Sequence, residues 1–98
     1  MTNNTALSNL KILDFTTLLP GPYATLMLAD MGAEVLKVSS KSKVDLVYEM
    51  GAFDEEIGLS ANQLWLNMNK KTISLNLKSP KAIEIIKELI KEYDIVIE

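Results

Sequence analysis

Lysines are the only side chains in this sequence that carry a positive charge. Its 98 residues include ten lysines and no arginine or histidine. A lysine ammonium is a compact cation on a long stem, which suits contacts with phosphate or carboxylate oxygens. Lys41, Lys43 and Lys78 each follow an apolar run typical of a strand, so they are the candidates for an anion site. A solvated surface position is the alternative for each of them.

Several classes of chemistry are excluded by residue types that the sequence lacks. With neither cysteine nor histidine, these residues cannot form a disulfide, a thiolate nucleophile, a Ser-His-Asp triad or the usual zinc site. Thirteen acidic residues are spread along the sequence and give a net charge of −3, which argues against a nucleic-acid surface. The run Asp54-Glu55-Glu56 could hold Mg²⁺, but adjacent acids rarely converge on one ion. We therefore expect a solvated loop there and no metal.

Residues 10–38 contain the elements that must position any such site. A strand is predicted by the apolar run Ile12, Leu13 and Phe15, and a helix by apolar residues at helical spacing, which are Ala24, Met27 or Leu28, and Met31. Pro22 suits the first turn of that helix, and Gly32 suits its end. A second strand follows over residues 34–38. Strands joined by one helix in this way are parallel neighbours with a right-handed crossover.

The turn at Leu19-Pro20-Gly21-Pro22 joins the carboxyl end of the first strand to the amino terminus of the helix. Ligands of open α/β sheets lie at this edge, where backbone N–H groups and the helix dipole favour negative charge. The sequence has no G-x-G-x-x-G and no G-x-x-x-x-G-K-[ST] motif, which argues against an ordinary dinucleotide or P-loop site. A turn with a purely structural role is the alternative.

The second half of the sequence repeats the strand-helix-strand order after a long excursion. Residues 44–60 have weak periodicity, and residues 61–69 predict either a short helix or an extended segment. Alternating apolar residues predict a half-buried strand over 72–77, Ser79-Pro80 predicts the start of an amphipathic helix, and residues 94–98 predict a further strand. The predicted fold is therefore α/β, a Rossmann-like three-layer half-domain with a mainly parallel sheet of about four strands in the order 3-2-1-4.

The last predicted strand would lie at an open sheet edge next to the first strand. Because such an edge is an aggregation hazard, we expect residues 1–98 to be a fragment of a longer chain, or to be paired with more protein. The amino terminus lacks a basic segment followed by a long apolar one, and no apolar run reaches the ~18 residues of a membrane span. A soluble cytoplasmic protein is expected.

The parallel arrangement sorts the basic residues by sheet edge. The turn at residues 18–21, residues 39–41 and residues 76–78 share the carboxyl edge, so a phosphate held there would meet Lys78, Lys41 or Lys43. Lys70 and Lys71 start the third strand and are expected on the opposite edge. Lys78 is therefore favoured over the Lys70-Lys71 pair as a phosphate ligand.

Three stretches together resemble the amino-terminal part of the class III CoA-transferases, the CaiB/BaiF family. They are LDFT with LPGPYAT, then LADMGAEVLKV, then LNMNKKTISLNLKSP, in the order and spacing typical of that family. The resemblance covers about residues 7–98. The family includes formyl-CoA transferase, carnitine CoA-transferase and α-methylacyl-CoA racemase. Residues 45–61 look more like the racemase branch.

The resemblance implies coenzyme A or an acyl-CoA as substrate, bound against the large Rossmann-like domain. The matching contact positions are Leu19, Pro20, Ser40, Leu75, Asn76, Leu77 and Lys78. Family members usually carry Glu followed by Arg or Pro where this sequence has Ser39-Ser40. An arginine contact to CoA is lost there, and Lys41 or Lys43 is the nearest replacement.

The resemblance assigns no catalytic residue to this sequence. The transferases use an aspartate that forms anhydride and thioester intermediates, the racemases use a His/Asp pair, and both sites lie downstream of the region covered. Asp14, Asp30 and Asp45 are therefore not promoted to nucleophiles. Full members are intertwined homodimers, which 98 residues cannot form. The alternatives are a noncatalytic nucleotide-binding or protein-binding module, and a degenerate remnant without function.

Overall fold

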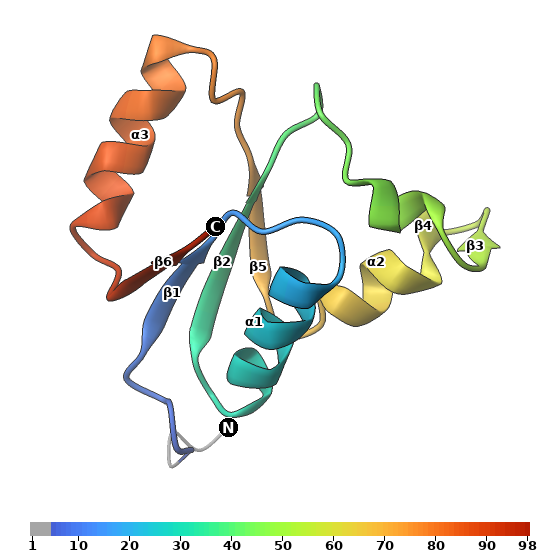
Figure 1. Ribbon diagram of the computed structural model, residues 1–98, viewed down its shortest axis with the longest axis horizontal. Helices are drawn as coiled ribbons and strands as arrows, with labels where there is room; N and C mark the ends of the chain where they lie inside the picture. The colour runs from blue at the N-terminus through green and yellow to red at the C-terminus, as the bar shows by residue number, and fades with distance from the viewer. Residues whose placement is uncertain (1–4) are drawn as a thin grey trace.

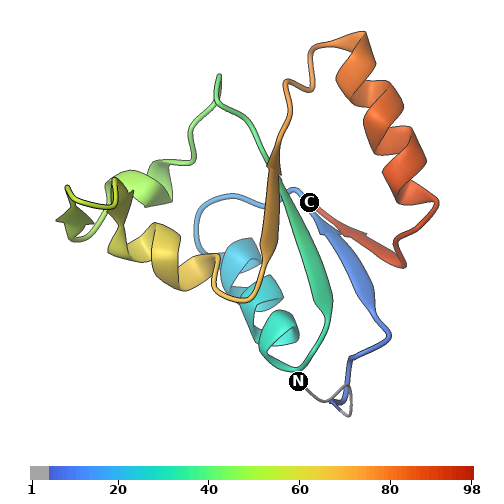
Figure 2. The same cartoon turned by 180° about the vertical axis from the view of Figure 1, so that it is seen from behind.

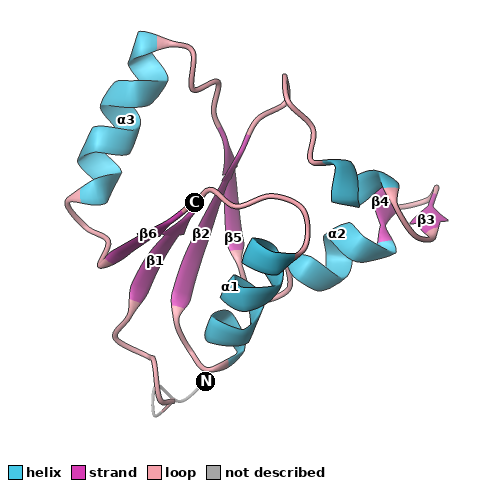
Figure 3. Ribbon diagram, in the orientation of Figure 1, coloured by secondary structure: helices cyan, strands magenta, loops and turns pink. Residues whose placement is uncertain are grey.

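Four parallel strands form the main sheet of the protein. The computed structural model describes residues 5–98. The strands are β1 (Lys11–Asp14), β2 (Glu34–Ser39), β5 (Lys71–Ser74) and β6 (Ile95–Ile97), and they lie in the order β5-β2-β1-β6, as Figure 1 and Figure 3 show. Every neighbouring pair in this sheet is parallel. The predicted fold class and the predicted order 3-2-1-4 are confirmed.

Helix α1 (Pro20–Asp30) connects β1 to β2. Pro20 opens it, and Gly32, with φ at +105°, follows its end as predicted. The face of the helix differs from the prediction, because its buried residues are Pro22, Thr25, Leu26 and Ala29, whereas Met27 and Met31 are exposed. Since α1 is apolar nearly all round, spacing alone could not identify the buried face.

The sheet is packed on both faces. One face carries Ile12 and Val35 against Ala29 of α1, and the other carries Leu13, Leu36 and Val38 against Ile86 of helix α3 (Pro80–Ile90). In Figure 1, α1 lies in front of β5 and beside β2, and in the reverse view of Figure 2 β5 passes in front of α1. The arrangement is the predicted three-layer α/β/α half-domain.

The excursion between β2 and β5 forms a small subassembly beside the sheet (Figure 1). It contains a 3₁₀ turn η1 (Leu46–Glu49), the antiparallel pair β3 (Phe53–Asp54) and β4 (Leu59–Ser60), and helix α2 (Ala61–Leu66). Ser60 caps α2 by accepting a hydrogen bond from the N–H of Gln63 at 3.1 Å. Trp65 of α2 packs against Tyr23 of α1, with ring centroids 5.7 Å apart.

Strand β5 is shorter than predicted, and its register is shifted toward the carboxyl end of β1. It ends at Ser74 instead of residue 77, because the chain then turns: Asn76 accepts hydrogen bonds from the N–H of Lys78 at 3.1 Å and of Ser79 at 2.9 Å. Lys71 pairs with Leu36, which itself pairs with Leu13. The start of β5 therefore lies level with the carboxyl half of β1, which changes where the lysines of this strand reach.

Candidate functional site

A cavity of about 690 Å³ opens at the carboxyl ends of the strands. Phe15, Thr16 and Thr17 after β1 line it, together with the end of β2, the segment after it and the ends of β5 and β6. The further lining residues are Lys37, Val38, Ser39, Ser40, Lys41, Lys43, Val44, Asp45, Tyr48, Gln63, Ser74, Leu77, Val96 and Glu98. This is the edge at which open α/β sheets bind ligands, and the volume is in the range of small-molecule sites.

The cavity brings together some of the residues predicted for CoA and leaves others outside its lining. Ser40 and Leu77 line it, as do Lys41 and Lys43, the two nearest replacements for the missing arginine. Outside the lining are Leu19, Pro20, Leu75, Asn76 and Lys78, all of which except Leu75 are exposed. Leu75 instead packs against the core cluster that contains Leu13 and Ile86, and its N–H donates a hydrogen bond to the Ser39 carbonyl at 2.8 Å.

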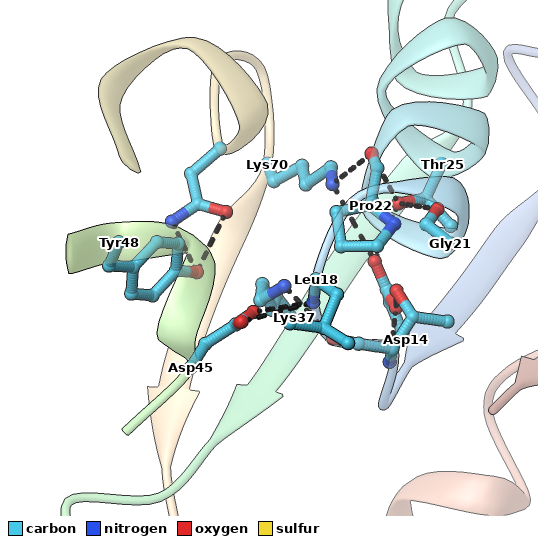
Figure 4. A network of polar contacts seen from close by, with 11 residues as sticks. Asp14, Leu18, Gly21, Pro22, Thr25, Lys37, Asp45, Tyr48 and Lys70 are labelled. Atoms are coloured by element: carbon cyan, nitrogen blue, oxygen red, sulfur yellow. Dashed lines mark hydrogen bonds and ion pairs between the residues drawn. The ribbon is translucent and has the colours of Figure 1, made fainter. Parts of the chain in front are cut away.

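Asp14 is the centre of a fully buried polar network beside the cavity, drawn in Figure 4. Its Oδ1 accepts hydrogen bonds from the backbone N–H of Thr16 at 2.8 Å and from the Thr16 hydroxyl. Its Oδ2 accepts from the Thr25 hydroxyl at 2.6 Å and lies 3.6 Å from the ammonium of Lys70. The network joins the end of β1, helix α1 and the start of β5. Asp14 is therefore a structural residue at the strand end.

The prediction that Lys70 lies at the edge of the sheet opposite the carboxyl ends of the strands is wrong. Its buried side chain reaches Asp14 at the carboxyl end of β1 and donates to the Pro22 carbonyl at 2.9 Å. The stagger of β5 is the reason, because the strand starts level with the carboxyl half of its neighbours. Burial lowers the pKa of Lys70 from its ordinary 10.5 to about 8, and the Asp14 carboxylate opposes that shift.

Asp45 anchors the excursion to the turn that precedes α1. Its carboxylate accepts the N–H of Leu18 at 3.0 and 3.1 Å and the N–H of Val47 at 3.1 Å, and the residue is 9% exposed. Leu18 has φ at +66°, a left-handed conformation that costs a leucine about 1–2 kcal/mol. The carboxylate therefore holds a strained residue of the turn in place.

The amino terminus of α1 is a poorer anion site than the turn motif suggested. Pro20 and Pro22 have no N–H, so among the first three helical residues Gly21 alone offers a backbone donor. Gly21 is needed for packing, because a Cβ there would lie 2.3 Å from Cβ of Thr16. Within residues 5–98 no group of three or more acidic side chains is placed to hold a metal ion.

Sequence reasoning missed most of the residues that line the cavity, Lys37 and Tyr48 among them. Lys37 was predicted only as part of the second strand, yet it is one of the residues that line the cavity, and Tyr48 of η1 is another. A usable signal for Lys37 was a lysine inside an otherwise apolar strand segment. Tyr48 had no comparable signal in the weakly periodic excursion.

Residues 7–98 match the sequence family described as CoA-transferase family III. The chain belongs to this family. It is 42% identical over 99 residues to human succinyl-CoA:glutarate CoA-transferase, and 37% identical over 94 residues to formyl-CoA:oxalate CoA-transferase of Bradyrhizobium diazoefficiens. These matches cover 100% and 95% of this chain but 22% of each relative.

A solved structure of a CAIB/BAIF family protein has the same fold over this region. The crystal structure of a CAIB/BAIF family protein from Brucella suis superposes with a TM-score of 0.82 at 29% identity, covering 95% of this chain and 25% of that protein. The chain thus spans about a quarter of the length of the proteins it matches. Within residues 5–98, none of the helices has the length and apolar character needed to span a membrane.

Proposed function

We propose that residues 1–98 form the CoA-binding amino-terminal portion of a family III CoA-transferase, which moves CoA between an acyl-CoA and a carboxylic acid. The observation that carries the proposal is the cavity at the carboxyl edge of the parallel sheet, in a chain of this family. Lys41 and Lys43 line that cavity and offer cations to phosphate oxygens. Ser40 and Leu77 are the CoA positions of the family resemblance that lie in the lining.

Transfer is favoured over racemisation as the reaction of the complete enzyme. The relatives compared above are named as transferases that use succinyl-CoA with glutarate, or formyl-CoA with oxalate. Residues 1–98 have no catalytic role in this enzyme. The complete enzyme is an intertwined homodimer, and it is located in the cytoplasm.

Titration with CoA tests the binding part of this proposal. We expect weak, saturable binding by isothermal titration calorimetry, and a higher Kd after Lys43→Ala, because the variant removes a cation that lines the cavity. Lys87→Ala on exposed α3 loses the same charge and should leave the Kd unchanged. The absence of any CoA binding would contradict the proposal and favour a noncatalytic binding module.

A second measurement separates binding from catalysis. These 98 residues should show no exchange of CoA between an acyl-CoA and a carboxylic acid, because the catalytic aspartate of the family lies outside them. An exchange rate above the uncatalysed background, with any of several acids, would show that a catalytic group does lie within residues 1–98.

A further inference from the structure

Two buried lysines lie on the same side of the sheet, and their surroundings differ. The Lys70 ammonium lies 3.6 Å from the Asp14 carboxylate. Lys37 is 2% exposed, but within residues 5–98 the ion pairs are Lys11 with Glu34, Lys70 with Asp14, and Lys91 with Glu88. In this part of the chain Lys37 therefore has no acidic partner.

The groups around Lys37 leave part of its hydrogen-bonding capacity unused. Its Nζ donates to the Thr16 carbonyl at 3.1 Å and lies 5.8 Å from the ring centroid of Tyr48. An ammonium has three N–H donors, and among residues 5–98 this carbonyl is its one hydrogen-bond acceptor. Lys37 is among the residues that line the cavity, as are Thr16 and Tyr48.

The nearby acids are engaged elsewhere. Asp14 is the backbone partner of Lys37 between β1 and β2, yet its oxygens accept from Thr16 and Thr25 and face Lys70. The oxygens of Asp45 accept the N–H groups of Leu18 and Val47. Glu98 lines the same cavity, and it forms no ion pair with Lys37.

A buried cation without an acidic partner is expensive, and a protein keeps one where it serves a ligand. We propose that Lys37 is the inner cation of the cavity and contacts an anionic oxygen group of the bound molecule, a phosphate or a carboxylate. Lys41 and Lys43 are the outer, exposed cations of the same cavity. The inference rests on the proposed function, because CoA and its acyl partners are the molecules that carry such groups.

The substitution Lys37→Met tests this role, because methionine keeps an unbranched stem and removes the charge. We expect the Kd for CoA to rise about 10- to 100-fold, the range for loss of one charged hydrogen bond. We expect Lys37→Arg to recover part of the affinity. Lys81→Met, on the exposed side of α3, is the matched control and should bind as the wild type does. The melting temperature of Lys37→Met should not fall, since the substitution removes an unpaired buried charge.

Comparison of probes identifies the group that Lys37 contacts. If the effect of Lys37→Met is lost with 3′-dephospho-CoA, the contact is the 3′-phosphate, and if it is lost only with pantetheine, the contact is the pyrophosphate. If CoA binding is insensitive but succinate binding is weakened, the contact is a carboxylate. Each of these results supports the inference.

Two results would overturn the inference. If Lys37→Met binds CoA and succinate as tightly as the wild type and melts at a lower temperature, Lys37 is a structural residue, while the proposed CoA binding stands. If the wild type binds no CoA, the proposed function fails, and the anion role must then be seen with succinate or inorganic phosphate. Wild-type binding of none of these probes would refute both.

Discussion

At the scale of single residues, one buried carboxylate organises three segments. Asp14 accepts hydrogen bonds from Thr16 and Thr25 and faces Lys70, so the end of β1, helix α1 and the start of β5 converge on it. The burial of Lys70 was not predictable from sequence. Its side chain reaches Asp14 because of the stagger between β2 and β5, and residue types do not encode that stagger directly.

The lowered pKa of Lys70 predicts a pH dependence of stability. Between its folded pKa of about 8 and its unfolded value of 10.5, the unfolded chain binds more protons at this residue. The free energy of unfolding should therefore rise with pH across this window, by at most about 1.4 kcal/mol per pH unit, relative to Lys70→Met. Urea melts of both proteins from pH 7.5 to 10.5 measure the difference. A difference that stays flat or falls with pH would mean that the ammonium is not disfavoured by burial.

At the scale of elements, α3 was the helix whose pattern best predicted its packing. Its amphipathic character was predicted, and its buried residues Ala82 and Ile86 lie on one face while the exposed Glu88 and Lys91 form an ion pair at 3.1 Å. Ser79 occupies the N-cap position of α3, but its side chain makes no hydrogen bond to the first turn of the helix. Helix α1 was predicted as an element but with the wrong apolar face, because polar residues that would mark an outer face are scarce in it.

Neighbouring isoleucines on α3 give a matched test of this packing. Ile86 is 9% exposed and packs with Leu13 and Leu36, whereas Ile85 is 41% exposed. Ile86→Ala should lower the free energy of unfolding by about 2–4 kcal/mol, and Ile85→Ala by less than about 0.5 kcal/mol. Thermal or urea denaturation measures both. Equal losses would show that α3 does not dock on the sheet by this face.

At the scale of the whole molecule, the two open edges of the sheet differ in character. The edge at β5 carries Lys71 and polar residues, a composition that discourages further pairing. The edge at β6 consists of Ile95, Val96 and Ile97, and the first two are 40% and 49% exposed. The parallel order was predictable from the strand-helix-strand pattern, whereas the antiparallel pair β3 and β4 was not, because two-residue strands leave no periodicity to detect.

The exposed edge at β6 predicts that the 98-residue protein associates with itself. In sedimentation velocity, the apparent mass should rise with concentration in the micromolar range, because unpaired strand groups and apolar side chains are exposed together. Val96→Lys should reduce this association. Ile85→Lys, which places the same charge on α3, should not. A wild-type protein that stays monodisperse and monomeric at every concentration would contradict the expectation.

The packing of Trp65 against Tyr23 gives the protein an intrinsic optical reporter. The sequence contains one tryptophan, and its ring packs against Tyr23 of α1, the helix on the opposite face of the sheet from α3. The fluorescence of Trp65 therefore reports whether the excursion remains packed on α1. The far-ultraviolet circular dichroism signal reports the secondary structure of the whole backbone. If the two signals change at different denaturant concentrations, the excursion detaches as a unit before the sheet opens.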